Sequence, residues 1–222
     1  MTFRKRLQHF LVKRLNISNK SALALILEGK VLVNDLAVFE NIEINIEDKV
    51  VYENQILQEG KQLIYIAFNK PRGIETTLNT DIMDNLKDIL PFEESLFPVG
   101  RLDKESEGLL LLTNDGRFFD KTLRSEHQTE KEYFVKVDKE ITDDFILKMS
   151  SGINILGKIT LPCPVKKVNE FTFKIILVQG INRQIRRMCY KLNYEVLELK
   201  RIRIGNILLG DLAPRGYFYV ER

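Results

Sequence analysis

The stretch of this chain best suited to chemistry is Gly100-Arg101-Leu102-Asp103. It places a guanidinium two residues before a carboxylate, and Glu105 and Glu107 follow closely. The apolar run Leu109–Leu112 comes next and predicts a buried strand. A carboxylate beside a buried strand is costly to desolvate unless a charge or hydrogen bond compensates it. The spacing therefore indicates either a structural ion pair or a catalytic carboxylate.

Few other side chains offer reactive groups. Histidine occurs only at positions 9 and 127, and cysteine only at positions 163 and 189. These four residues are not spaced as metal ligands, so we predict no bound metal. Two cysteines are too few for a disulfide framework, and we assign none of the four residues a function. Catalysis then falls to carboxylate, tyrosine and arginine side chains. Cysteines that we expect to be reduced favour a cytoplasmic protein.

The composition is that of an ordinary soluble protein of one or two domains. The chain has 222 residues, of which 44% are hydrophobic and 29% are charged. Its apolar runs are far shorter than the roughly 18 residues that a membrane span needs. We also expect no signal peptide, because no apolar segment follows the basic residues at the N-terminus.

Charge is unevenly distributed along the chain, although the net value is only +3. Residues 1–30 carry seven basic side chains against one acidic, and residues 174–203 carry eight against two. Residues 31–60 reverse the balance, with seven acidic side chains against one basic. Two basic stretches favour contact with nucleic-acid phosphates, although two solvated helix faces would give the same counts.

The N-terminal residues predict a small module of two helices and short strands. Apolar residues at positions i, i+3, i+4 and i+8 predict a helix over residues 4–15. Ser18 can cap a second helix that runs to residue 28, and Gly29 ends it. Two short strands and a polar linker follow, at residues 31–33, 50–52 and 55–61.

A second module of strands and scattered helices begins at residue 61. We expect strands at residues 63–68, 108–113, 132–137, 161–168 and 171–178. We expect helices at residues 83–89, 117–124, 142–149 and 182–192. Strands that mostly follow one another through short connections favour an α+β fold over a doubly wound parallel one. The predicted domains are therefore residues 1–60 and residues 61–222.

Four motifs of the second module resemble those of the RsuA/RluB/RluF family of pseudouridine synthases. They have the order and approximate spacing of that family: Asn69–Gly73, Gly100–Asp103, Lys131–Tyr133 and Asn182–Met188. Other segments look most similar to the RluF-type branch, which acts on 23S ribosomal RNA. Two basic helices leading into Gly-Lys-Val-Leu-Val-Asn resemble an S4 RNA-binding (α-L) domain, although Ser18–Ser21 departs from its usual basic turn.

The resemblance implies an enzyme that isomerises uridine to pseudouridine, with a mixed, largely antiparallel sheet and no cofactor. Asp103 would be the nucleophile, and Arg186 would favour its charged form. Tyr133 would stack on the flipped uracil, while Arg101 would fill the space that the base leaves or steady the loop. Further RNA contacts are expected from Lys70, Arg72, Arg183, Arg187, Arg4, Lys5, Arg6, Lys13, Lys20 and Lys30.

Alternatives from other functional classes remain open. A non-catalytic rRNA-binding or ribosome-assembly factor would use the same basic surfaces without turnover. A glycoside hydrolase would need a second partnered acid, for which Glu105 or Glu107 is available. The same isomerisation could also act on 16S ribosomal RNA or a tRNA. Our main hypothesis is a monomeric enzyme that acts on 23S ribosomal RNA or a large-subunit assembly intermediate.

Overall fold

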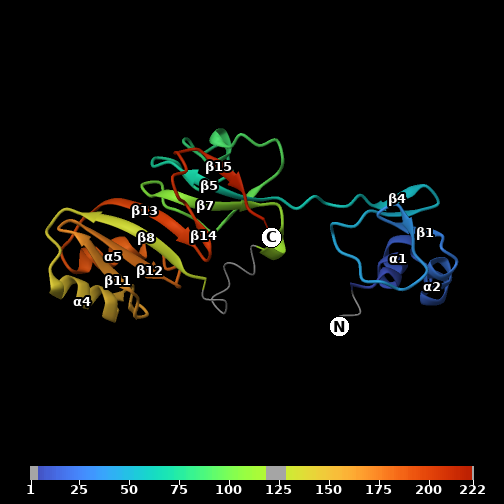
Figure 1. Ribbon diagram of the computed structural model, residues 1–222, viewed down its shortest axis with the longest axis horizontal. Coiled ribbons are helices and arrows are strands. Elements are labelled where there is room, and N and C mark those ends of the chain that lie inside the picture. Colours follow the sequence, from blue (N-terminus) through green and yellow to red (C-terminus); the bar gives the residue numbers. More distant parts are fainter. Residues whose placement is uncertain (1–4, 119–128, 222) are drawn as a thin grey trace. The chain divides into compact units, whose positions relative to one another are not determined.

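The chain forms two compact units in the computed structural model, which describes residues 5–118 and 129–221 (Figure 1). The units are Met1–Leu63 and Ile64–Arg222. Both combine helices with sheets, so the predicted α+β class is confirmed. Within the described ranges, no helix is long and apolar enough to cross a membrane.

The first unit packs two helices against a four-stranded sheet of order β2-β1-β3-β4. The Ser18 hydroxyl accepts a hydrogen bond from the Ser21 amide and caps the second helix, as predicted. Leu7 and Leu11 from the first helix meet Ala22 and Ile26 from the second in a buried core. The elements are α1 (Leu7–Leu15), α2 (Asn19–Leu27), β1 (Val31–Val33), β2 (Leu36–Ala37), β3 (Val50–Tyr52) and β4 (Gln55–Gln58).

The predicted polar linker at residues 55–61 was wrong in its first half, because β4 lies there and pairs with β3. Glu53 and Asn54 both adopt positive φ angles, the backbone of a two-residue hairpin turn. Leu57 is buried in the core while its neighbours Gln55 and Ile56 are exposed. A half-solvated edge strand of this composition is hard to distinguish from a linker by sequence.

The second unit is built on a nine-stranded sheet. Its main path runs β11-β12-β8-β13-β7-β5-β15, with β6 and β14 added beside β7 and β13. Among the strand pairs of the described residues, only that of β13 with β7 is parallel, so the sheet is mixed and largely antiparallel, as the resemblance implied. The strands are β5 (Tyr65–Lys70), β6 (Phe97–Val99), β7 (Glu107–Thr113), β8 (Lys131–Val137), β11 (Val165–Asn169), β12 (Thr172–Leu177), β13 (Val196–Ile204), β14 (Ile207–Leu208) and β15 (Tyr217–Tyr219). A separate hairpin joins β9 (Asn154–Ile155) to β10 (Lys158–Ile159).

Two helices cover one half of this sheet, as Figure 1 shows. Phe145 and Met149 of α4 (Asp143–Ser151) and Met188 of α5 (Gln184–Lys191) pack with the buried residues of β8, β12 and β13. Thr142 caps α4 through the Phe145 amide, as expected. This packing fixes the start of α5 beside the middle of the sheet.

One predicted helix differs from the structure, another lies largely outside the described residues, and one strand was not predicted. The expected helix at residues 83–89 is only a 3-10 turn, η2 (Lys87–Ile89), because Asp84 has a positive φ and the Asn85 side chain hydrogen-bonds nearby backbone groups. The expected helix at residues 117–124 lies largely outside the described residues. The central strand β13 was missed, since its alternating charged residues were interpreted as part of a basic surface.

Candidate active site

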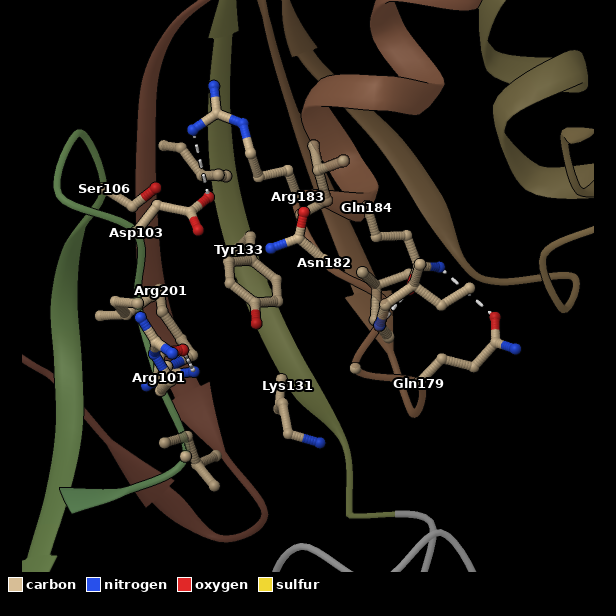
Figure 2. A pocket seen from close by; sticks show the side chains of 18 of the residues that line it. Arg101, Asp103, Ser106, Lys131, Tyr133, Gln179, Asn182, Arg183, Gln184 and Arg201 are labelled. Atoms are coloured by element: carbon tan, nitrogen blue, oxygen red, sulfur yellow. Dashed lines mark hydrogen bonds and ion pairs between the residues drawn. The ribbon is translucent and has the colours of Figure 1, made fainter. Parts of the chain in front are cut away.

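A cleft of about 530 Å³ lies over the seam where β13 meets β7. The loop between β6 and β7 forms one wall with Asp103, and the start of α5 forms another with Arg183 (Figure 2). Tyr133 of β8 and Arg201 of β13 also line it. The structure thus brings together two of the three predicted catalytic residues, Asp103 and Tyr133.

The carboxylate of Asp103 is 30% exposed and faces one guanidinium. Arg183 Nη1 lies 3.8 Å from Asp103 Oδ2, and Arg183 Nη2 lies 3.4 Å from Glu105 Oε2. The Arg183 guanidinium thus bridges the carboxylates of Asp103 and Glu105, and Asp103 lines the cleft.

Arg186, expected to favour the charged form of Asp103, lies close enough for the charge of Asp103 to act on it, although its direct contacts in the described part of the chain are with other groups. Its guanidinium donates to the backbone oxygens of Val196 and Glu105, both at 3.0 Å, and lies 3.9 Å from the Glu105 carboxylate. Burial lowers the pKa of Arg186, and the charge of Glu105 opposes this shift. Arg186 thus ties α5 to β13 and to the Asp103 loop, while Arg183 faces the carboxylate.

The Asp103 loop is also held from the side of residues 73–76. The Thr76 hydroxyl donates to the Leu102 oxygen at 2.7 Å and accepts from the Leu102 amide at 3.2 Å. The Gly73 amide donates to the Lys104 oxygen at 2.7 Å. Backbone anchors on both sides of Asp103 restrict where its carboxylate can point, which is the pre-organisation that a reacting group needs.

Tyr133 extends into the cleft from β8, two residues after Lys131 on the same strand (Figure 2). Its ring is half-buried and packs against the core between the sheet and the helices. Burial lowers the pKa of Lys131, with a smaller contribution from the charge of Arg201. A flat aromatic ring beside a carboxylate can stack on a base whose sugar faces that carboxylate.

Sequence reasoning missed the amide side chains of the cleft. Gln179, Asn182 and Gln184 line it, and the Gln184 amide nitrogen lies 3.4 Å from Gln179 Oε1. Each amide offers both donors and an acceptor, the groups that match the polar edge of a uracil ring. Their position in and beside the Asn182–Met188 motif was the available signal.

Lys70, predicted to contact RNA phosphates, is completely buried, so that prediction was wrong. Its ammonium donates to the backbone oxygens of Ile74 at 2.6 Å and Pro71 at 3.0 Å. Burial lowers the pKa of Lys70 to about 8, against the raising influence of Glu75 and Asp103. Lys70 is therefore a cation behind the cleft and not part of an RNA-facing surface.

The remaining predicted RNA contacts have differing environments. Arg101 and Arg72 are exposed, and the Arg72 guanidinium reaches the Leu197 oxygen at 3.2 Å. Arg187 is half-buried and hydrogen-bonds Asn182.

In the first unit, Arg4 lies outside the described residues, Arg6 is half-buried and donates to the Asn41 oxygen, and Lys30 pairs with Glu28. The remaining ones, Lys5, Lys13 and Lys20, are exposed.

The cysteines stand apart from this cleft. Both are buried free thiols, and burial raises the pKa of Cys163 to about 11 and that of Cys189 to about 12. Neither thiol is therefore a ready nucleophile. In the described part of the chain, no group of three histidine, cysteine or acidic residues could hold a metal ion.

Comparison with known proteins shows the family to which the chain is related. The sequence profile of the RNA pseudouridylate synthase family matches residues 64–191, the part that contains Asp103, Tyr133 and Arg183. The chain belongs to this family. A crystal structure of a pseudouridylate synthase is similar over 97% of this chain and 96% of that chain, with a TM-score of 0.68 and 25% identity.

Several members of the RNA pseudouridylate synthase family are similar over most of their length. The dual-specificity RNA pseudouridine synthase RluF of Escherichia coli is 44% identical over 88% of this chain and 68% of its own. The ribosomal large subunit pseudouridine synthase B of Bacillus subtilis is 32% identical over 89% and 84%. An uncharacterised RNA pseudouridine synthase of Aquifex aeolicus is 31% identical over 95% and 90%. The chain is thus an enzyme of this class, and the hydrolase alternative is rejected.

Proposed function

We propose that this enzyme isomerises a uridine of large-subunit ribosomal RNA, with Asp103 as the nucleophile. The observation that supports this most is the position of Asp103, partly desolvated and 3.8 Å from a guanidinium, beside the half-buried Tyr133 ring. The similarity to RluF and to a large-subunit synthase supports 23S ribosomal RNA as the substrate.

The reaction needs these side chains because it breaks the N1–C1′ bond of uridine and forms a C5–C1′ bond to the same sugar. In this proposal the charged oxygen of Asp103 attacks the sugar or the base and holds one fragment while uracil turns. Tyr133 stacks on the extruded base, and the ion pair with Arg183 orients the Asp103 carboxylate. The C5 proton leaves in the last step, so no redox partner or group donor is needed.

The first unit is proposed to be an S4-like RNA-binding domain, and the second unit the catalytic domain. Two helices that present the exposed Lys13 and Lys20, on a small sheet, support this assignment. Positive charge on a separate unit adds phosphate contacts that are independent of the cleft. We further propose that the enzyme works as a monomer in the cytoplasm, on ribosomal RNA or an assembly intermediate.

Tritium release separates this function from RNA binding without turnover. Transcripts of 23S ribosomal RNA, 16S ribosomal RNA and tRNA, labelled with tritium at uridine C5, would be incubated with the purified enzyme. Because the C5 proton is lost, isomerisation releases tritium, and we expect release from the 23S transcript. Binding without release from any transcript would support the assembly-factor alternative. Release from 16S or tRNA alone would reassign the substrate.

A further inference from the structure

Arg201 is a buried cation that neither the sequence motifs nor the proposed reaction uses. Its side chain belongs to β13 and lines the cleft, yet the residue is only 3% exposed. Its guanidinium has no ion pair with a carboxylate in the described part of the chain, and its Nη2 atom is buried without a hydrogen-bond partner. Burying a charge in this way is costly, so a specific role should compensate it.

An irregularity in β13 points Arg201 toward the cleft. Opposite β8, Arg201 pairs with Tyr133 and Arg203 pairs with Glu132, so a bulge lies between the two arginines. Cross-strand partners share a face of the sheet, and Glu132 and Tyr133 are on opposite faces. The bulge therefore places Arg201 on the face of Tyr133 and Arg203 on the other face, where it pairs with Glu130 and Glu132.

The Arg201 guanidinium joins β13 to the segment that carries Asp103. Its Nε donates to the Leu109 oxygen at 2.7 Å, and its Nη1 lies 3.5 Å from the Arg101 oxygen, two residues before Asp103. The second contact is long for a hydrogen bond, but a cation still attracts a carbonyl dipole at that distance. One side chain therefore joins the loop that precedes β7, through Arg101, to β7 itself, through Leu109.

The backbones of β13 and β7 meet close to Arg201. The parallel ladder between β13 and β7 has two pairs, Lys200 with Glu107 and Arg201 with Gly108. Gly108 has a φ of +106°, and a Cβ atom there would lie 2.3 Å from the Arg201 oxygen. With only two residue pairs between β13 and β7, few backbone hydrogen bonds set the distance between the two halves of the sheet. Side-chain contacts between these strands therefore contribute more to fixing that distance.

We propose that Arg201 is a positioning residue that fixes Asp103 relative to Tyr133. The connection runs from Tyr133 through its cross-strand partner Arg201 to the Arg101 oxygen and then to Asp103. Because Arg201 is buried, it acts through the loop and not by touching RNA. This inference rests on the proposed function, since it assumes that Asp103 and Tyr133 act on one nucleotide.

The test compares Arg201→Met with Arg203→Met in the full-length enzyme. Both variants keep the apolar stem of an arginine on β13, but only the first removes the guanidinium that holds the Asp103 loop. We expect the single-turnover rate at saturating RNA to fall about 100-fold in Arg201→Met, because a misplacement on the order of 1 Å has this effect. RNA affinity should stay near wild type. Arg203→Met should keep its rate within about threefold, although it removes two ion pairs.

Two further measurements guard against a simple loss of folding. Arg201→Lys keeps the positive charge, but a single ammonium group cannot contact the Leu109 and Arg101 carbonyls at the same time, as a planar guanidinium does. The single-turnover rate of Arg201→Lys should therefore lie between those of wild type and Arg201→Met. Amide hydrogen exchange of residues 100–106 should be faster in Arg201→Met and unchanged in Arg203→Met.

Several outcomes would overturn the role of Arg201. These are a near-wild-type rate in Arg201→Met, an equal loss of rate in Arg203→Met, unchanged exchange in the loop, or weaker RNA binding with an unchanged saturated rate. Asp103→Asn serves as the reference. If that variant is active, the proposed function fails; if it is inactive while Arg201→Met is fully active, only the positioning role fails.

Discussion

Arg183 Nη1 lies 3.8 Å from Asp103 Oδ2, and this ion pair joins the start of α5 to the loop between β6 and β7. Arg183 adopts a left-handed backbone conformation, with a φ of 52°, at the residue before the helix. Its side chain therefore does not follow the helical repeat that Arg186 and Arg187 follow. This geometry makes Arg183 the residue that forms an ion pair with Asp103 in the described part of the chain.

Arg183→Met should lower the single-turnover rate at saturating RNA by about tenfold or more, because it removes the ion pair that holds the Asp103 carboxylate to the start of α5. Arg186→Met is the comparison, since its contacts are mainly with backbone oxygens. We expect it to reduce stability by about 1–3 kcal/mol and to lower the saturated rate less. Single-turnover rates and urea unfolding of both variants check this, and a larger fall of the saturated rate in Arg186→Met would contradict the assignment.

Tyr133→Phe should keep base stacking and remove only the hydroxyl. If this hydroxyl takes part in removing the C5 proton, the single-turnover rate should fall by about 100-fold or more while RNA affinity is retained. Tyr133→Leu should abolish stacking as well, which is worth about 1–3 kcal/mol per base. Rates of tritium release for the two variants measure the separate contributions. Wild-type rates in Tyr133→Phe would limit Tyr133 to stacking.

Lys70 gives the protein a stability that depends on pH. The pKa of Lys70 is about 8 in the folded protein, below the ordinary value of 10.5. Between these values the folded state has released the proton and the unfolded state still binds it, so rising pH favours folding. Relative to Lys70→Met, the wild-type unfolding free energy should increase by up to about 3 kcal/mol from about pH 8 to about pH 10. Urea unfolding of both proteins tests this, and a constant difference would contradict it.

Removing residues 1–63 should leave a folded catalytic unit that binds ribosomal RNA more weakly. For each interaction with an RNA phosphate that the truncation removes, the slope of log affinity against log salt should flatten by about 0.7–0.9. Full-length enzyme with Lys13→Gln and Lys20→Gln is the matched control and should show part of this change. An unaltered slope in the truncated protein would mean that the first unit is not an RNA-binding domain.

Much of the fold could be predicted, since its signals are local. The apolar run at Leu109–Leu112 indicated the buried strand β7, and the caps at Ser18 and Thr142 marked two helix starts. Strand β13 could not be recognised, because a bulge interrupts its alternation and a buried arginine lies in its centre.

The candidate site was predictable in type but not in its pairings. Motif order indicated Asp103 and Tyr133, which line one cleft. The partner of Asp103 depended on a left-handed residue at the start of α5, which helical spacing does not reveal. The burial of Lys70 followed from its place on a strand that is buried on both faces, whereas its sequence neighbours Pro71 and Gly73 suggested an exposed turn.

The most direct test of the central claim is tritium release by Asp103→Asn from the 23S transcript. The amide keeps the shape of the side chain and removes the charged oxygen, so RNA binding and folding should match the wild type. We predict that release falls below about one part in a thousand of the wild-type rate. Release within about tenfold of wild type would contradict the role of Asp103 as the nucleophile.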